Sequence, residues 1–85
     1  DGHSHFFPEQ SVYSMVEDRH GSIWVATFGH GLKRITDNVV DSMSAKEGLS
    51  TDHLFSVFED REGSIWVGTY DGGLNCFSRS AFLTY

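Results

Sequence analysis

The chain contains two copies of one sequence motif, and this internal repeat limits the available folds more than any other feature. At an offset of 42 positions, residues 13–35 fall opposite residues 55–77, and 12 of the 23 pairs are identical. The shared part reads EDR, any residue, GSIWV, any residue, T and, after three residues, GL. A repeat of this length indicates a solenoid, a propeller or an array of stacked units.

Each repeat predicts four short β-strands and no helix. Runs rich in Val, Ile, Phe, Tyr and Trp alternate with clusters of Gly, Asp and Asn, which is typical of strands joined by tight turns. The expected strands lie near residues 11–17, 22–27, 31–36 and 39–43, and near residues 53–59, 64–69, 73–78 and 81–85. We therefore expect one unit over residues 1–43 and a second over residues 44–85.

Equivalent turns are expected to close the first hairpin of each unit. Gly21 and Gly63 stand where a positive φ is required, and glycine adopts that conformation without steric cost. Asp18 and Asp60 precede these glycines, and their side chains are suited to accept hydrogen bonds from the amides of the turn. We assign all four residues a structural role.

Apolar residues are expected on both faces of each sheet, because alternate side chains of a strand point to opposite sides. Strict alternation predicts that Val12 and Val16 oppose Tyr13 and Met15, and that Leu54 and Phe58 oppose Phe55 and Val57. The third and fourth strands are more polar, so burial should fall from the first strand to the fourth. A sheet buried on both faces, with exposed outer strands, is typical of a propeller blade.

Two blades cannot close a ring, so each outer sheet face should need a partner. Trp24 and Trp66 occupy the middle of the second strands, where packing between blades accounts for them better than carbohydrate stacking. A whole sheet face of exposed apolar side chains is rare in a monomer. The predicted fold is therefore all-β, with two four-stranded antiparallel blades and a ring completed by homo-oligomerisation. Propellers have about four to eight blades, so a trimer would give about six and a tetramer about eight.

The motif resembles the two-component regulator propeller repeat, found in the extracytoplasmic sensor regions of bacterial hybrid histidine kinases and some diguanylate cyclases. The resemblance rests on a strand ending in EDR, then GSIWV, then T and a glycine pair before Leu, and covers nearly the whole chain. It implies a periplasmic location in the parent protein, a role in signal transduction and a small carbohydrate as the candidate ligand. The first copy departs from the pattern at Ala26 and His30, where the second copy has glycine.

The composition excludes several partners and linkages. The formal net charge is −6, whereas binding to nucleic-acid phosphates requires an excess of positive charge. No apolar run approaches the roughly 18 residues of a membrane span, and the first ten residues lack the pattern of a signal peptide. We therefore expect a soluble chain. Cys76 is the single cysteine, which excludes an intrachain disulfide and a cysteine zinc site.

No catalytic residue, cofactor or metal site is predicted. His3 and His5 could share one side of an extended segment, but a zinc site usually requires about three protein ligands or more. The Glu-Asp pairs at residues 17–18 and 59–60 could serve as acid and base, yet their recurrence favours a structural role. No nucleophile with an adjacent base and no glycine-rich phosphate loop can be identified.

Topology selects one end of the blades as a candidate binding surface. In an up-and-down blade, the loop before the first strand and the loop between the second and third strands emerge at the same end. That end should carry residues 1–10, 28–31, 44–52 and 70–73, with Phe28, His30, Lys46, Asp52, His53, Tyr70 and Asp71 among the exposed side chains. We take Phe28, His30, His53, Tyr70 and Asp71 as candidate ligand-binding residues. The alternative is that they are ordinary loop residues.

Three functions remain open at this point. The main hypothesis is a non-catalytic, self-assembling interaction module, because the open sheet faces must be covered in any case. The second is the carbohydrate-sensing part of an extracytoplasmic sensor propeller. The third is a fragment of a glycan-active enzyme of the propeller type. A fold alone does not choose among these functions.

Overall fold

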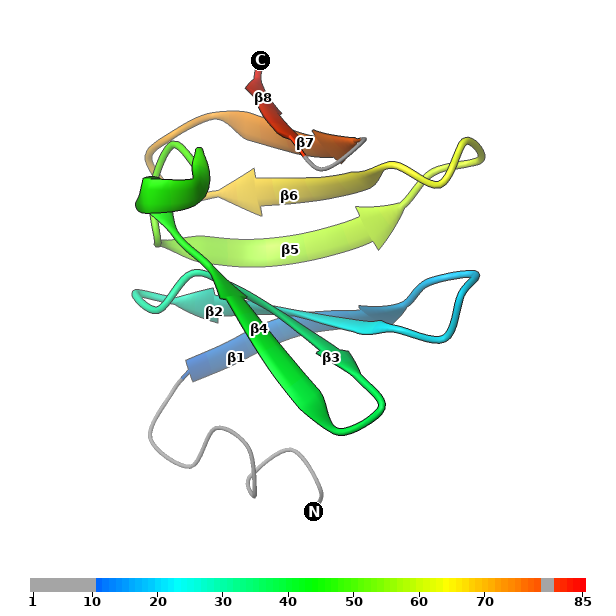
Figure 1. Ribbon diagram of the computed structural model, residues 1–85. Coiled ribbons are helices and arrows are strands. Elements are labelled where there is room, and N and C mark those ends of the chain that lie inside the picture. The colour runs from blue at the N-terminus through cyan, green and yellow to red at the C-terminus, as the bar shows by residue number, and fades with distance from the viewer. Residues whose placement is uncertain (1–10, 79–80) are drawn as a thin grey trace.

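The chain folds into two four-stranded antiparallel β-sheets that are stacked face to face (Figure 1). The computed structural model describes residues 11–78 and 81–85. The first sheet contains β1 (Ser11–Glu17), β2 (Ile23–Phe28), β3 (Leu32–Thr36) and β4 (Val39–Met43). The second sheet contains β5 (Leu54–Glu59), β6 (Ile65–Thr69), β7 (Leu74–Ser78) and β8 (Ala81–Thr84). In both sheets the strands lie in chain order.

These bounds confirm the all-β prediction, and each strand lies within about one residue of its expected limits. The segment between the sheets was expected to be a loop, but it contains the 3-10 helix η1 (Ala45–Glu47). Ser44 and Glu47 form a capping box at its start, in which the Ser44 amide donates to Glu47 Oε1 at 2.7 Å. A reciprocal cap of this kind satisfies amides that lack a partner in the first turn.

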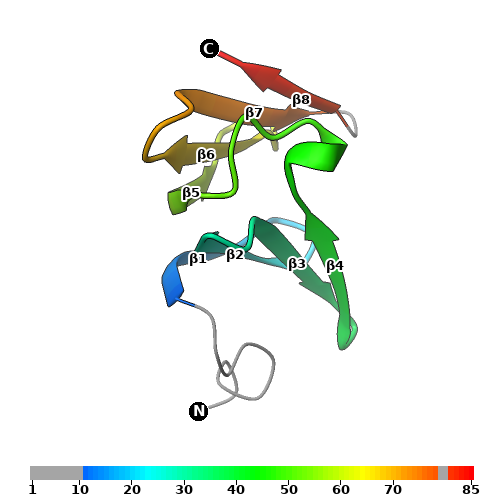
Figure 2. The ribbon, with the colours of Figure 1, turned by 90° about the vertical axis from the view of Figure 1, so that its left-hand side faces the viewer.

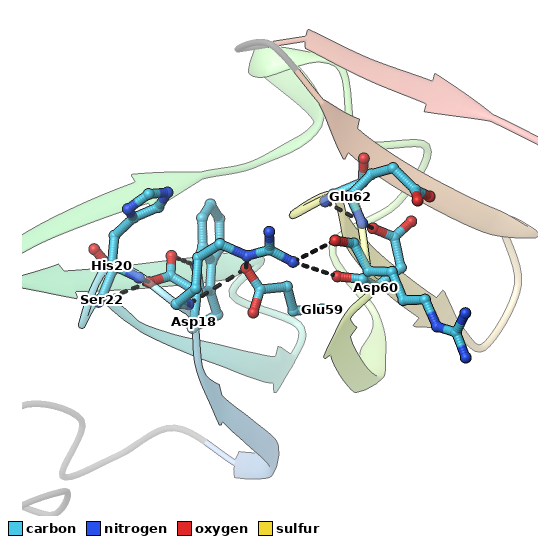
Figure 3. Close-up of polar contacts among 10 residues, drawn as sticks. Asp18, His20, Ser22, Glu59, Asp60 and Glu62 are labelled. Atoms are coloured by element: carbon cyan, nitrogen blue, oxygen red, sulfur yellow. Dashed lines mark hydrogen bonds and ion pairs between the residues drawn. The ribbon is translucent and has the colours of Figure 1, made fainter.

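An aspartate closes the first hairpin of each sheet and fixes the tryptophan of the next strand (Figure 3). Asp18 Oδ1 accepts from the amides of His20 at 2.9 Å and Ser22 at 3.0 Å, and Oδ2 accepts from Trp24 Nε1 at 2.8 Å. Gly21 has a φ of 89° in this turn. The second sheet repeats the arrangement with Asp60, Glu62, Ser64, Trp66 and Gly63. The repeated EDR-x-GSIW motif therefore encodes one turn that positions one indole.

The hydrophobic core lies between the two sheets, where β5 contacts both β1 and β2 (Figure 2). Trp24 is 2% exposed, and its ring centroid lies 5.5 Å from that of Phe77 in the other sheet. The other buried residues of this cluster are Ala26, Leu32, Met43, Leu49, Leu54, Val57, Ile65 and Val67. Full burial of a large apolar side chain contributes about 1.5–3 kcal/mol, so this contact is a main source of stability.

The predicted grouping of side chains along the first strands is wrong. In β1 the register with β2 shifts between Val12 and Ser14, and β5 has the equivalent shift between Leu54 and Ser56. A bulge inserts one unpaired residue and reverses the alternation beyond it. Val12 therefore shares a face with Met15, not with Val16. Leu54 likewise shares a face with Val57 and is fully buried against the first sheet.

The predicted fall of burial from the first strand to the fourth is also wrong. Burial is greatest in β2, where Trp24, Val25 and Ala26 are at most 2% exposed. β1 is an edge strand of its sheet, whereas β2 has a strand on either side. Tyr13 on β1 is correspondingly exposed. The fourth strand of the first sheet, β4, is mostly exposed, as the sequence indicated.

The second sheet turns an apolar face away from the first. Strand register places Phe58, Trp66, Cys76 and Leu83 in one row across this face. Cys76 is buried, and we call Phe58, Trp66 and Leu83 the Trp66 face. Phe58 and Leu83 are exposed, and Trp66 is half-buried. The rings of Phe58 and Trp66 are stacked with their centroids 6.5 Å apart. The Trp66 face thus leaves large apolar side chains open to water.

The first sheet also has an apolar face on the side away from the second. It carries Met15, Ile23, Val25 and Ile35, and we call these four residues the Val25 face. Val25 and Ile35 are buried, and Met15 and Ile23 pack against them. The two sheets therefore present two different apolar faces on opposite outer sides of the stack.

Candidate functional site

Four of the five candidate ligand-binding residues meet at one end of the strands, in or beside the loops at the left of Figure 1. The ring centroid of Phe28 lies 4.9 Å from that of His53 and 6.0 Å from that of Tyr70. Asp71 Oδ2 lies 3.4 Å from His53 Nδ1. We call Phe28, His53, Tyr70 and Asp71 the aromatic rim. Its side chains are exposed or partly exposed, with Tyr70 73% exposed.

Backbone contacts between the two sheets hold the aromatic rim in place. Phe28 and His53 form an isolated antiparallel bridge. The Gly29 amide donates to the carbonyl oxygen of Asp52 at 2.8 Å, and the Tyr70 amide donates to that of His53 at 2.9 Å. The segment that leads into β5 therefore joins the β2–β3 turn to the β6–β7 turn. Side chains of both turns are fixed relative to each other by this segment.

The side chains of His30 and Asp52 do not join the aromatic rim. His30 is exposed in the β2–β3 turn, and within the described residues it has no ring or ion-pair contact with the rim. Asp52 has a local role, since its Oδ1 accepts from the Ala45 amide at 3.0 Å. Residues 1–10, including His3 and His5, lie outside the described part of the chain.

Sequence reasoning missed a cavity between the two sheets at the opposite end from the aromatic rim. It has a volume of about 340 Å³, and its walls include Asp18, His20, Trp24, Arg34 and Glu62. The Arg34 guanidinium lies over the Trp24 ring at 5.2 Å and bonds to Asp41 Oδ2 at 3.4 Å. Acidic, basic and apolar groups are mixed in this cavity, so its chemistry does not select one class of ligand.

Sequence reasoning also missed an arginine that joins the two sheets at this end. Figure 3 labels Glu59 and Asp60, two of its partners in the second sheet. Arg19 Nε donates to Glu59 Oε2 at 3.2 Å, and its terminal nitrogen donates to the carbonyl oxygens of Asp60 at 3.0 Å and Arg61 at 2.6 Å. We call these contacts the Arg19 clasp. The clasp connects the first β-turn of one sheet to the equivalent turn of the next. The recurrence of EDR in both repeats was the signal that could have found it.

The turn aspartates are held in their charged form. Partial burial raises the pKa of Asp18, but hydrogen bonds from the Trp24 indole and the amides of Ser22 and His20 outweigh it and lower the pKa below 3.8. The Trp66 indole is the main cause that lowers the pKa of Asp60. Both carboxylates therefore act as acceptors, and neither is suited to donate a proton near neutral pH.

We expect the free energy of unfolding to fall in acid because these two aspartates become protonated. Their folded-state pKa values are lowered. The stabilisation is therefore complete when the pH lies above the pKa of Asp in the unfolded chain, about 3.9. It is lost as the pH falls through the lower folded values. Urea unfolding between about pH 2 and pH 6 should show a smaller pH dependence for Asp18→Asn/Asp60→Asn than for the parent chain. Identical pH profiles would contradict this assignment.

Neither a metal cluster nor a membrane helix is found in residues 11–78 and 81–85. No group of three or more His, Cys, Asp or Glu side chains there could hold a metal ion. No helix in the same residues is long and apolar enough to cross a membrane. Cys76 is a buried free thiol.

Comparison with known proteins agrees with this architecture. No curated protein matches the chain. Among solved structures, it is similar to the extracellular domain assigned to the one component system BT4673 from B. thetaiotaomicron, with 28% identity and a TM-score of 0.71. The match covers 89% of this chain and 11% of that one. The family profile "Two component regulator propeller" matches residues 7–29 and 48–71. Its two matches and the two blades together show that the chain belongs to the two component regulator propeller family.

Proposed function

We propose that this chain is a non-catalytic propeller module that assembles through its two outer sheet faces, and that copies of the chain complete the ring. The observation that carries the proposal is the correspondence between the Trp66 face and the buried face of the first sheet. The 42-residue offset places Phe58 and Trp66 at the positions of Val16 and Trp24. In the first sheet these positions pack against the second sheet.

The receiving surfaces correspond in the same way. Trp24 packs in the cluster that contains Ile65 and Val67, with Phe77 beside it. The offset relates these three residues to Ile23, Val25 and Ile35, which belong to the Val25 face. A Trp66 face could therefore pack on a Val25 face as the first sheet packs on the second. Such a head-to-tail contact joins different surfaces of identical chains, and it closes into a ring when the rotation permits.

The family and the solved neighbour support a place for this module in an extracytoplasmic sensor. The neighbour is an extracellular domain, and this chain corresponds to 11% of its length. In a longer propeller, further blades would cover the same two faces. The module would then form part of the rigid ring that presents loops for recognition.

Assembly should make thermal stability depend on protein concentration, because folding and association are linked. We expect the midpoint of thermal unfolding to rise when the concentration is increased about a hundredfold. Circular dichroism of the β-sheet signal over such a series measures this shift. A midpoint that does not change with concentration would contradict assembly.

Ligand sensing at the aromatic rim is a second candidate function. The rim combines exposed aromatic rings with a carboxylate and an imidazole, and two turns and the segment leading into β5 position it. Apolar rings with a few oriented polar groups are typical of small-molecule sites. A carbohydrate fits this composition, because a sugar ring presents an apolar side to an aromatic ring and hydroxyl groups to polar side chains.

We expect Tyr70→Ala to weaken carbohydrate binding at least about tenfold, because Tyr is among the residue types that contribute most to binding energy where a ligand covers them. A glycan array identifies the sugar, and titration calorimetry measures the change in Kd. His20→Ala is the control, since His20 is exposed at the opposite end of the blades. Equal affinities of the parent chain and Tyr70→Ala would exclude the rim as the site.

A further inference from the structure

The second blade carries an unused copy of the arginine that joins the two sheets. The 42-residue offset relates Arg19 to Arg61. Arg61 is exposed, and within residues 11–78 and 81–85 its guanidinium makes no hydrogen bond or ion pair. It extends from the β5–β6 turn, which has the same aspartate and glycine geometry as the β1–β2 turn that carries Arg19. The donor half of a second clasp is therefore present.

The first blade carries an unused copy of the acceptor. The offset relates Glu59 to Glu17, which is exposed and has no ion-pair partner among the described residues. Register with β2 places Glu17 opposite Ile23, so its side chain lies on the same face as Ile23. This is the Val25 face, on the side away from the second blade. The carbonyl oxygens of Asp18 and Arg19 lie in the adjoining turn. They correspond to the carbonyl oxygens of Asp60 and Arg61 in the second blade, which accept from Arg19.

A serine contact between the sheets is repeated in the same way. Ser14 Oγ accepts from the Val57 amide at 3.3 Å across the observed blade contact. The offset relates Ser14 to Ser56 and Val57 to Met15. Ser56 lies on the side of β5 that carries Phe58, and Met15 belongs to the Val25 face. The polar contacts of the observed interface therefore have both halves of a second set on the outer faces.

We propose that Arg61 of one copy binds Glu17 of the next copy and the carbonyl oxygens of Asp18 and Arg19 in its first turn. This inference deepens the proposed function and rests on it, since it names the contact that sets the register of assembly. A second copy of this chain is the fitting occupant because one chain holds both halves of the clasp. Complementary charges at such a rim fix register and exclude wrong pairings.

Charge-reversal variants test whether the contact between Arg61 and Glu17 contributes to assembly beyond the apolar faces. Arg61→Glu and Glu17→Arg each place like charges opposite one another in a homotypic contact. We expect each variant to raise the concentration at half-assembly at least about tenfold, because a like-charge pair across an interface is strongly unfavourable. The double variant should recover part of the lost assembly, since it restores the ion pair with opposite polarity but cannot donate to the carbonyl oxygens of Asp18 and Arg19. Lys46→Glu is the control for Arg61→Glu, with the same charge change on an exposed residue of η1.

An equimolar mixture of the two single variants provides a stricter test. In one kind of contact, the new carboxylate of Arg61→Glu faces the new guanidinium of Glu17→Arg, and in the other kind the unchanged Arg61 faces the unchanged Glu17. Both contacts are complementary, so the mixture should associate at concentrations where each variant alone does not. Alternation of two kinds of copy closes a ring of four, whereas in a ring of three it leaves one unfavourable contact. Analytical ultracentrifugation distinguishes these masses.

The outcomes separate the clasp from the proposed function. The clasp is supported if the parent chain and Lys46→Glu assemble whereas Arg61→Glu and Glu17→Arg alone do not. Assembly must then return in the mixture or in the double variant. If the single variants assemble as well as the parent chain, the clasp is wrong and assembly through the apolar faces stands. If the parent chain stays monomeric, the proposed function is wrong. Circular dichroism confirms that each variant keeps its β-sheet content.

Discussion

Trp24→Ala is expected to lower the free energy of unfolding by about 3–5 kcal/mol, as for other large buried aromatic residues. Trp24 is 2% exposed between the two sheets, and its indole nitrogen donates to Asp18. The substitution leaves a cavity against Phe77 and removes one hydrogen bond of the turn. Domains are stable by only about 5–15 kcal/mol, so much of the chain should unfold. Urea unfolding followed by Trp66 fluorescence measures the change.

Trp66→Ala is the matched control for this prediction. Trp66 makes the same bond to Asp60, but its ring is half-buried on the open face of the second sheet. At concentrations where the chain is monomeric, Trp66→Ala should therefore lower the free energy of unfolding clearly less than Trp24→Ala does. At assembling concentrations the cost should increase, because the proposed contact buries the ring. A loss below about 1 kcal/mol for Trp24→Ala would refute its assignment to the core.

Phe58→Asp is expected to abolish assembly without unfolding the blades. Phe58 is 53% exposed on the Trp66 face, so the folded monomer tolerates a polar side chain there. In the proposed contact the same position becomes buried, and an unpaired buried carboxylate is strongly unfavourable. The particle should therefore have the mass of a single chain at concentrations where the parent chain is assembled. Size-exclusion chromatography with light scattering measures this mass.

Val39→Asp is the corresponding control for the open face. Val39 is 59% exposed and lies on β4, outside both the Trp66 face and the Val25 face. It introduces the same negative charge on a strand, but the proposed contact does not include it. This variant should assemble as the parent chain does. Equal assembly of Phe58→Asp and the parent chain would show that the Trp66 face is not the contact surface.

The strands could be predicted from the sequence because the repeat supplies two independent readings of each element. The motif GSIWV occurs after an Asp-Arg-x turn in both units, so the start of β2 and the start of β6 support each other. Glycines at Gly21 and Gly63 mark the turns, and both have a positive φ. The short helix η1 was not expected, since one turn of helix has no periodicity to detect.

Alternation failed at the bulges in β1 and β5. Nothing in the order of apolar residues distinguishes Tyr13 or Phe55 from a regular strand residue, because an inserted residue changes the partner and not the composition. The consequence is large, since Leu54 moves from the open face to the core. Topology was enough to place Phe28, His53 and Tyr70 at one end of the stack. Their contact depends on a backbone bridge that sequence reasoning did not anticipate.

The contacts of Asp18 and Arg19 were missed for a different reason. Asp18 and Trp24 are six residues apart, and the same spacing recurs in the second repeat. Recurrence indicated a structural role, but it did not show that the carboxylate reaches the indole as well as the turn amides. The EDR motif predicted a turn beside Asp18, but it did not show that the Arg19 guanidinium reaches the next sheet. Contacts between repeats require the spacing of the sheets, which the sequence does not contain.

The mass of the parent chain in solution across a dilution series tests the central claim most directly. The claim is that the Trp66 face of one copy covers the Val25 face of another. Light scattering should find three or four times the 9.5 kDa of one chain at high concentration, and this mass should fall on dilution. A folded particle of 9.5 kDa at every concentration would contradict the claim.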